Sequence, residues 1–200
     1  MTTLPANSPT GRRLILLQSL TLAWMLAECA ISLFSAARAH SPALLAFGLD
    51  SFVELLSAAL VVLALSPRLT RRRIDTASGI LLFILAAAVA LTSILALVGK
   101  VQPESSPLGI AITVAALLVM PLLAWQKRKL ARLTANNALA ADAVQSATCA
   151  YLAAIALAGL ALNAVFHLAS ADALAALAAV PILILEGRRA MRGHSCGCCP

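Results

Sequence analysis

The chain has 200 residues, of which 62% are hydrophobic and 12% charged, and its formal net charge is +7. Soluble domains are about 45–50% apolar. This composition, with a mean hydropathy of +0.95, therefore excludes an ordinary soluble domain and indicates an integral membrane protein.

Apolar segments long enough to cross a bilayer, which takes about 20 residues, occur along the whole chain. They are Leu14–Ala36, Ala43–Leu65, Ala77–Val98, Leu108–Trp125, Asn136–Phe166 and Ser170–Leu185. The fourth and sixth contain Pro121 and Pro181, which a membrane helix tolerates where neighbouring helices satisfy the freed backbone groups. We predict an all-α fold, a six-helix transmembrane bundle over residues 14–186, with a cytoplasmic segment at 1–13 and a basic, Cys-rich cytoplasmic tail at 187–200.

An alternative for the first segment is a secretory signal peptide that ends at Ala37-Arg38-Ala39. Its apolar run is longer than such a peptide needs and contains Glu28, so we favour a membrane helix.

The basic residues alternate between the two sides of the predicted bundle. Thirteen fall on the side of the chain ends: Arg12, Arg13, Arg68, Arg71, Arg72, Arg73, Lys127, Arg128, Lys129, Arg132, Arg188, Arg189 and Arg192. The other side has only Arg38 and Lys100. By the positive-inside rule both termini are cytoplasmic. Because the clusters adjoin helix ends, the partner they indicate is the bilayer and not nucleic acid.

Acidic residues inside the predicted spans are Glu28, Asp50, Glu54 and Asp142. An ionised carboxylate at the centre of a membrane helix costs roughly 2.5–3.5 kcal/mol, and Asp50 and Glu54 are one turn apart on one face. The pair predicts a cation bound within the membrane. The alternative is a neutral, hydrogen-bonded pair that joins helices.

The remaining acids lie near segment ends, where we expect them to be in water. They are Asp75, Glu104, Asp172 and Glu186.

The fifth segment has Asp142, Gln145 and Cys149 at i, i+3 and i+7, on one helix face. Antiparallel packing against the second segment sets Cys149 near Asp50 and Gln145 near Glu54, with Asp142 closer to the cytoplasm. All five are candidate metal ligands, since a small divalent cation takes a compact set of O, N or S donors. Taken singly, Cys149 is also typical of a small core residue and Gln145 of an interhelical hydrogen bond.

Glu28 is a further candidate. We expect a proton-relay or helix-packing role for it, with direct ligation as the alternative.

The last residues combine an imidazole and three thiols within six positions, a composition typical of soft-metal binding. They are His194, Cys196, Cys198 and Cys199. We interpret them as capturing or delivering a thiophilic ion. A dispensable or lipidated tail is the alternative, although a prenylation box would need a cysteine where the chain has Gly197.

The chain resembles the cation diffusion facilitator family over all six segments, including the basic loop that follows the fourth, and the motifs of segments two and five carry the resemblance. The family's second helix typically reads S-x-A-L-x-A-D-A-x-D-S-x-x-D, and the chain runs from Ser41 to Glu54 with Asp50 and Glu54 at the last two acidic positions. The family's fifth-helix pattern, A-D-x-x-H-x-x-x-D, is matched at Asp142 but has Gln145 and Cys149 at the later positions. The chain is most similar to a branch with F-G-L-D-S-x-x-E in helix two, a Glu in helix one matched by Glu28, and a late E-G-R matched by Glu186-Gly187-Arg188.

The resemblance implies a homodimeric exporter in a bacterial inner membrane that moves a divalent metal ion out of the cytoplasm against protons. It implies no enzymatic activity and no permanently bound cofactor. We expect the family's C-terminal cytoplasmic domain to be absent. Replacing His and Asp by Gln145 and Cys149 is expected to shift the preference from zinc toward softer ions such as cadmium or cobalt.

Two other functions remain open. One is a non-transporting membrane metal sensor or partner subunit. The other is inward metal delivery, as in small Cys-bearing mercury importers, which usually have paired cysteines in the first helix, where this chain has Cys29 alone.

Overall fold

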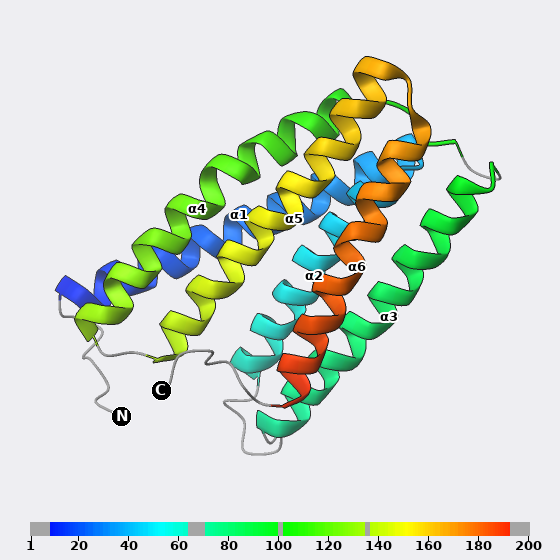
Figure 1. The fold of residues 1–200 in the computed structure, drawn as a ribbon. Coiled ribbons are helices and arrows are strands. Elements are labelled where there is room, and N and C mark those ends of the chain that lie inside the picture. The colour runs from blue at the N-terminus through cyan, green and yellow to red at the C-terminus, as the bar shows by residue number, and fades with distance from the viewer. Residues whose placement is uncertain (1–8, 64–70, 100–101, 135–136, 193–200) are drawn as a thin grey trace.

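The structure is a computed structural model that describes residues 9–63, 71–99, 102–134 and 137–192. Within these ranges the chain is all-helical (Figure 1). The helices are α1 (Pro9–Ala39), α2 (Pro42–Leu63), α3 (Arg71–Leu97), α4 (Pro107–Thr134), α5 (Asn137–Phe166) and α6 (Ala169–Met191).

Five of these helices, α1, α3, α4, α5 and α6, are long and apolar enough to cross a membrane. This agrees with the expectation of an integral membrane protein. The second predicted span corresponds to α2, which has 22 residues and ends where the description of the chain stops at residue 63.

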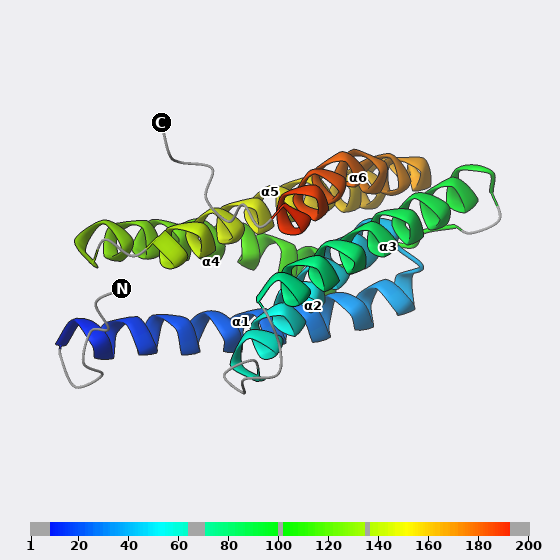
Figure 2. The same ribbon diagram turned by 90° about the horizontal axis from the view of Figure 1, so that it is seen from below.

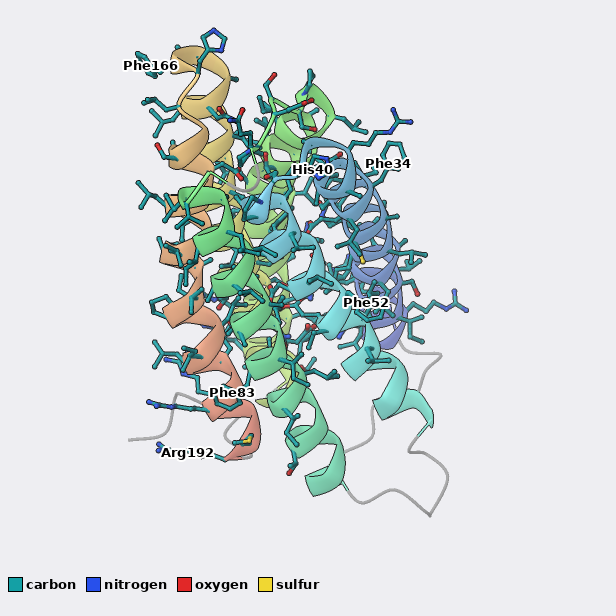
Figure 3. All side chains as sticks on the ribbon, turned by 90° about the vertical axis from the view of Figure 1, so that its right-hand side faces the viewer. Phe34, His40, Phe52, Phe83, Phe166 and Arg192 are labelled. Atoms are coloured by element: carbon teal, nitrogen blue, oxygen red, sulfur yellow. The ribbon has the colours of Figure 1, made fainter. Side chains whose placement is uncertain are left out.

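Large apolar side chains project from the outside of the bundle, as they do in a protein surrounded by lipid. Phe34 is 54% exposed, and Phe52 and Phe166 also point away from the helices (Figure 3).

Ser-Pro pairs define where two helices begin. The Ser41 hydroxyl accepts a hydrogen bond from the backbone N of Leu44 at 3.1 Å, and the Ser106 hydroxyl accepts one from Gly109 at 3.0 Å. A serine N-cap satisfies a backbone N–H that lacks a helical partner, and proline suits the first helical position. Both α2 and α4 therefore start directly after their capping serine.

Four helices are longer than predicted: α1 and α3 begin before their apolar segments, at Pro9 and Arg71, and α4 and α6 continue beyond theirs. α4 continues past Trp125 to Thr134, so the segment with Lys127, which we expected to be a basic loop, is helical. α6 continues past Leu185 to Met191. Hydropathy marks only the apolar part of a helix, whereas lysine and arginine are good helix formers and extend it. Pro121 and Pro181 lie inside α4 and α6, as the sequence predicted.

Around the bundle, successive neighbours are α1, α2, α3, α6, α5 and α4, and α4 returns to contact α1. α2 also contacts α5 and α6, so it is surrounded by four helices. Figure 2 shows α1 and α2 on one side and α5 and α6 on the other. The start of α1 and the end of α6 lie toward the same end of the bundle (Figure 1).

A close backbone approach joins α3 to α6 at two glycines, Gly79 and Gly187. A Cβ added to Gly79 would lie 2.8 Å from the carbonyl oxygen of Gly187 and closer still to Met191 Cγ. Real Cβ atoms do not approach backbone oxygens this closely, so the helices meet here only because both residues lack a side chain.

Gly79→Ala should therefore destabilise the protein by about 1–3 kcal/mol, because overpacking pushes α3 away from α6. Thermal unfolding in detergent measures the effect. Ala87→Val, which adds bulk on an exposed face of α3, is the matched control and should leave the transition nearly unchanged. Equal effects of the two substitutions would contradict the close contact.

Candidate functional site

The Glu28 carboxylate joins three helices at one point. Glu28 is fully buried on α1 and accepts hydrogen bonds from Trp24 Nε1 at 2.8 Å and Ser51 Oγ of α2 at 2.6 Å. The Cys149 thiol of α5 donates a third, with 3.2 Å between Sγ and Oε1. This environment satisfies the carboxylate with protein donors and fixes α1 against α2 and α5.

Asp50 and Glu54 are also buried on α2, but their surroundings differ. Both carboxylate oxygens of Asp50 and Oε1 of Glu54 have no hydrogen-bond partner among the described residues. The groups that act electrostatically on Asp50 are themselves acids, Glu186 and Glu28. The pair therefore offers unsatisfied oxygens in an electronegative surrounding, which is the arrangement that a cation satisfies.

The predicted register, which sets Gln145 of α5 near Glu54 of α2, is found in the structure. Gln145 forms a side-chain hydrogen bond with Glu54. Cys149 is fully buried and lies close enough to Glu54 and Asp50 to interact with both electrostatically. The Cys149 thiol, however, donates its hydrogen bond to Glu28, so its direct partner is on α1 and not on α2.

Glu186 belongs to the same group of acids, and our expectation that it is solvated at a helix end is wrong. It is half-buried on the extended part of α6, forms a hydrogen bond with Thr148, and interacts electrostatically with Asp50 and Glu54. The apolar run of the predicted sixth span ends at Leu185, one residue before Glu186. The E-G-R match at Glu186 was the only sequence signal for it.

Asp142 lies apart from this group and has its own counterion. Lys127 Nζ is 2.9 Å from Asp142 Oδ2, and Gln18 Nε2 of α1 donates to the same oxygen at 2.9 Å. Lys127, which we expected in the basic loop after the fourth segment, is completely buried on α4. A carboxylate paired in this way differs from the unpartnered Asp50.

Asp172 is a second acid that we placed in water wrongly. It is fully buried in the first turn of α6 and accepts a hydrogen bond from Ser41 Oγ at 2.8 Å. Its other oxygen lies 3.5 Å from the backbone N of Ala43, at the start of α2. Glu104 is exposed, as expected, and the Asp75 side chain lies outside the part of the chain described.

The predicted tail ligands His194, Cys196, Cys198 and Cys199 also lie outside the described residues. Among the residues that are described, no group of three or more His, Cys, Asp or Glu side chains is arranged to hold a metal ion. The acids of α1, α2 and α6 are thus neighbours without forming a closed coordination cage.

Comparison of the chain with models of protein families and with curated proteins gives no match. The site is therefore interpreted from its own residues and their surroundings.

The hydrogen bonds around Glu28 make a prediction about stability. Glu28→Ala leaves the donors of Trp24 and Cys149 unpaired and Ser51 Oγ with only the backbone oxygen of Phe47, at 3.3 Å, and should lower the free energy of unfolding by roughly 2–5 kcal/mol. Glu28→Gln keeps an acceptor oxygen and should cost less. Thermal unfolding measures both, with the exposed Glu104→Ala as control; an equal, small effect of Glu28→Ala and Glu104→Ala would show that the contacts contribute little.

Proposed function

We propose that the protein exports a divalent heavy-metal cation from the cytoplasm in exchange for protons, by alternating access to a site inside the membrane. The observation that supports this most directly is the pair of buried acids on α2. Three of their oxygens, both of Asp50 and one of Glu54, have no hydrogen-bond partner among the described residues.

Leaving such atoms unsatisfied is costly. A buried polar group without a partner costs about 1–3 kcal/mol, and more when it is charged. The same protein gives every oxygen of Glu28 a donor, so the fold is able to satisfy a buried carboxylate. Oxygens left open one helical turn apart, beside further acids, are suited to a cation that binds and leaves.

The donor set supports a transition-metal or soft cation as substrate. We propose Asp50 and Glu54 as the principal ligands, with the Cys149 thiolate and the Gln145 amide completing the coordination from α5. Carboxylate oxygens and a thiolate suit zinc, and the thiolate favours softer ions such as cadmium, with cobalt also accepted. Ligation by Cys149 requires its thiol to turn away from Glu28, because no closed cage is present among the described residues.

Competition at this single site provides the coupling. Carboxyl and thiol groups must lose their protons to bind metal, so binding from the cytoplasm releases protons. When the site opens to the outer side, protons compete for the same groups and the metal leaves.

We further propose that the protein is a homodimeric member of the cation diffusion facilitator family in a bacterial inner membrane, with both termini in the cytoplasm. The Ser41-to-Glu54 motif supports the family. The thirteen basic residues on the side of the chain ends support the orientation.

Asp50→Asn keeps the shape of the side chain but removes the charge that a cation requires. In proteoliposomes with a pH-sensitive dye inside, it should abolish metal-dependent proton flux, while Glu104→Gln, the same change at an exposed position, should have no effect. Unchanged flux in Asp50→Asn would overturn the site. Metal binding without flux in the wild type would instead favour a sensor or partner subunit.

Cys149→Ser replaces the soft donor by a hard one. Across a panel of metals, the ratio of cadmium to zinc transport should fall roughly tenfold, which corresponds to about 1.4 kcal/mol in relative affinity. Cys29→Ser is the matched control, because Cys29 is also a buried free thiol beside Glu28. If the two variants change the ratio equally, Cys149 is not a ligand.

A further inference from the structure

A second polar cluster lies outside the proposed metal site and joins three helices. It consists of Gln18 on α1, Lys127 on α4, and Asp142 and Ser146 on α5. Lys127 Nζ lies 2.9 Å from Asp142 Oδ2 and donates to Ser146 Oγ at 2.9 Å, and Gln18 Nε2 donates to Asp142 Oδ2 at 2.9 Å. We call these four residues the Lys127 cluster.

The burial of Lys127 is what separates this cluster from the other basic residues of α4. The Lys127 side chain is completely buried, whereas Asp142 is 34% exposed. Two positions on, Lys129 is exposed, with its Nζ 5.5 Å from the ring centre of Trp125. A lysine almost never becomes fully buried unless it is paired, so the fold holds this ammonium in place through Asp142 and Ser146.

The Lys127 cluster lies between the proposed metal site and one end of the bundle. Asp142 precedes Cys149 by two turns of α5, a distance of about 10 Å at 1.5 Å per residue. The start of α1, the end of α4 and the start of α5 are all at this end of the bundle (Figure 1). A cation that approaches from there between α1, α4 and α5 meets the cluster before it reaches Cys149.

We propose that the Lys127 cluster is the cytoplasmic gate of the transport route, closed in this structure by the Lys127 ammonium. The bound ammonium occupies the carboxylate that would first attract an entering divalent cation, and its positive charge repels that cation. Its hydrogen bonds also tie α4 to α5, while Gln18 ties α5 to α1. Opening the route therefore requires Lys127 to leave Asp142.

The chemistry of lysine suits this exchange. Its ammonium is a compact charge on a flexible four-carbon stem, which allows it to withdraw along α4 toward the end of the helix while the stem stays on apolar surface. Asp142, partly exposed, then becomes free to receive the cation. Lys127 thus acts as a tethered cation that the substrate displaces.

The inference rests on the proposed function for the transport route, its cytoplasmic side and the ion that passes. Whether the gate controls access to the interior is measured without transport. Cys149 is fully buried beyond the cluster, and its rate of modification by a membrane-impermeant, positively charged methanethiosulfonate reports access from one side.

The experiment uses the full chain in oriented membrane vesicles, with Cys29, Cys196, Cys198 and Cys199 replaced by serine. Lys127→Gln in this background should raise the rate of Cys149 modification from the side of the chain termini by about tenfold. This corresponds to a decrease of about 1.4 kcal/mol in the free energy of opening the gate. Lys129→Gln removes the same charge at the neighbouring exposed position and should leave the rate unchanged.

A second variant separates gating from general loosening of the fold. The charge exchange Lys127→Glu with Asp142→Lys reverses the pair and should return Cys149 to slow modification. In a parallel background that keeps Cys29 and has Cys149 replaced by serine, Lys127→Gln should leave the modification of the buried Cys29 slow.

The outcomes distinguish this inference from the proposed function. An unchanged Cys149 rate in Lys127→Gln, an equal effect of Lys129→Gln, or an equal rise at Cys29 would overturn the gate, whatever the transport assay gives. A faster Cys149 rate that the charge exchange reverses would support the gate, even if no metal is transported and the proposed function fails.

Discussion

Buried carboxylates need partners, and the meeting of three donors at Glu28 is the contact on which the centre of this bundle depends. Trp24, Ser51 and Cys149 reach the same carboxylate from α1, α2 and α5. Directional hydrogen bonds of this kind fix how far each helix is shifted along the bundle axis relative to its neighbours. Apolar packing in lipid does not, because lipid tails are as apolar as the helices themselves. The axial position of α2 relative to α5 in turn determines where Asp50 and Glu54 lie opposite α5.

The other buried acids show that the chain has several ways to satisfy a carboxylate. Asp142 forms an ion pair with the Lys127 ammonium, and Asp172 accepts a hydrogen bond from the Ser41 hydroxyl at the start of α2. Among the carboxylates of the described residues, Asp50 and Glu54 are the ones with buried oxygens that lack a hydrogen-bond partner. The contrast within a single protein is the physical argument for a site that is filled only part of the time.

The helices and the register of α5 were predictable because they depend on periodic patterns. A run of apolar residues marks a helix whatever its neighbours are, and the i, i+3, i+7 spacing fixes which face carries Gln145 and Cys149. The partner of the Cys149 thiol was not predictable, since the choice between Asp50 and Glu28 depends on how α1 packs, which the pattern of α5 does not contain.

Charged residues near helix ends were the weakest part of the sequence interpretation. Lys127, Asp172 and Glu186 all follow or precede an apolar run, and hydropathy assigns such residues to water. In the structure Lys127 and Asp172 are fully buried and Glu186 is half-buried. Lys127 and Glu186 lie on parts of α4 and α6 that continue beyond the apolar run, and Asp172, in the first turn of α6, is covered by the start of α2. Burial at a helix end depends on tertiary neighbours, so a single sequence contains little information about it.

The two acids of α6 have a mechanical consequence. Asp172 attaches the first turn of α6 to the start of α2, while Glu186 approaches Asp50 and Glu54 farther along the same pair of helices. The two acids are about 21 Å apart along α6 at 1.5 Å per residue. With the Asp172 contact as a pivot, a tilt of α6 by a few degrees moves Glu186 by an ångström or more relative to Asp50, so a small rotation at one end changes the electrostatic field at the other.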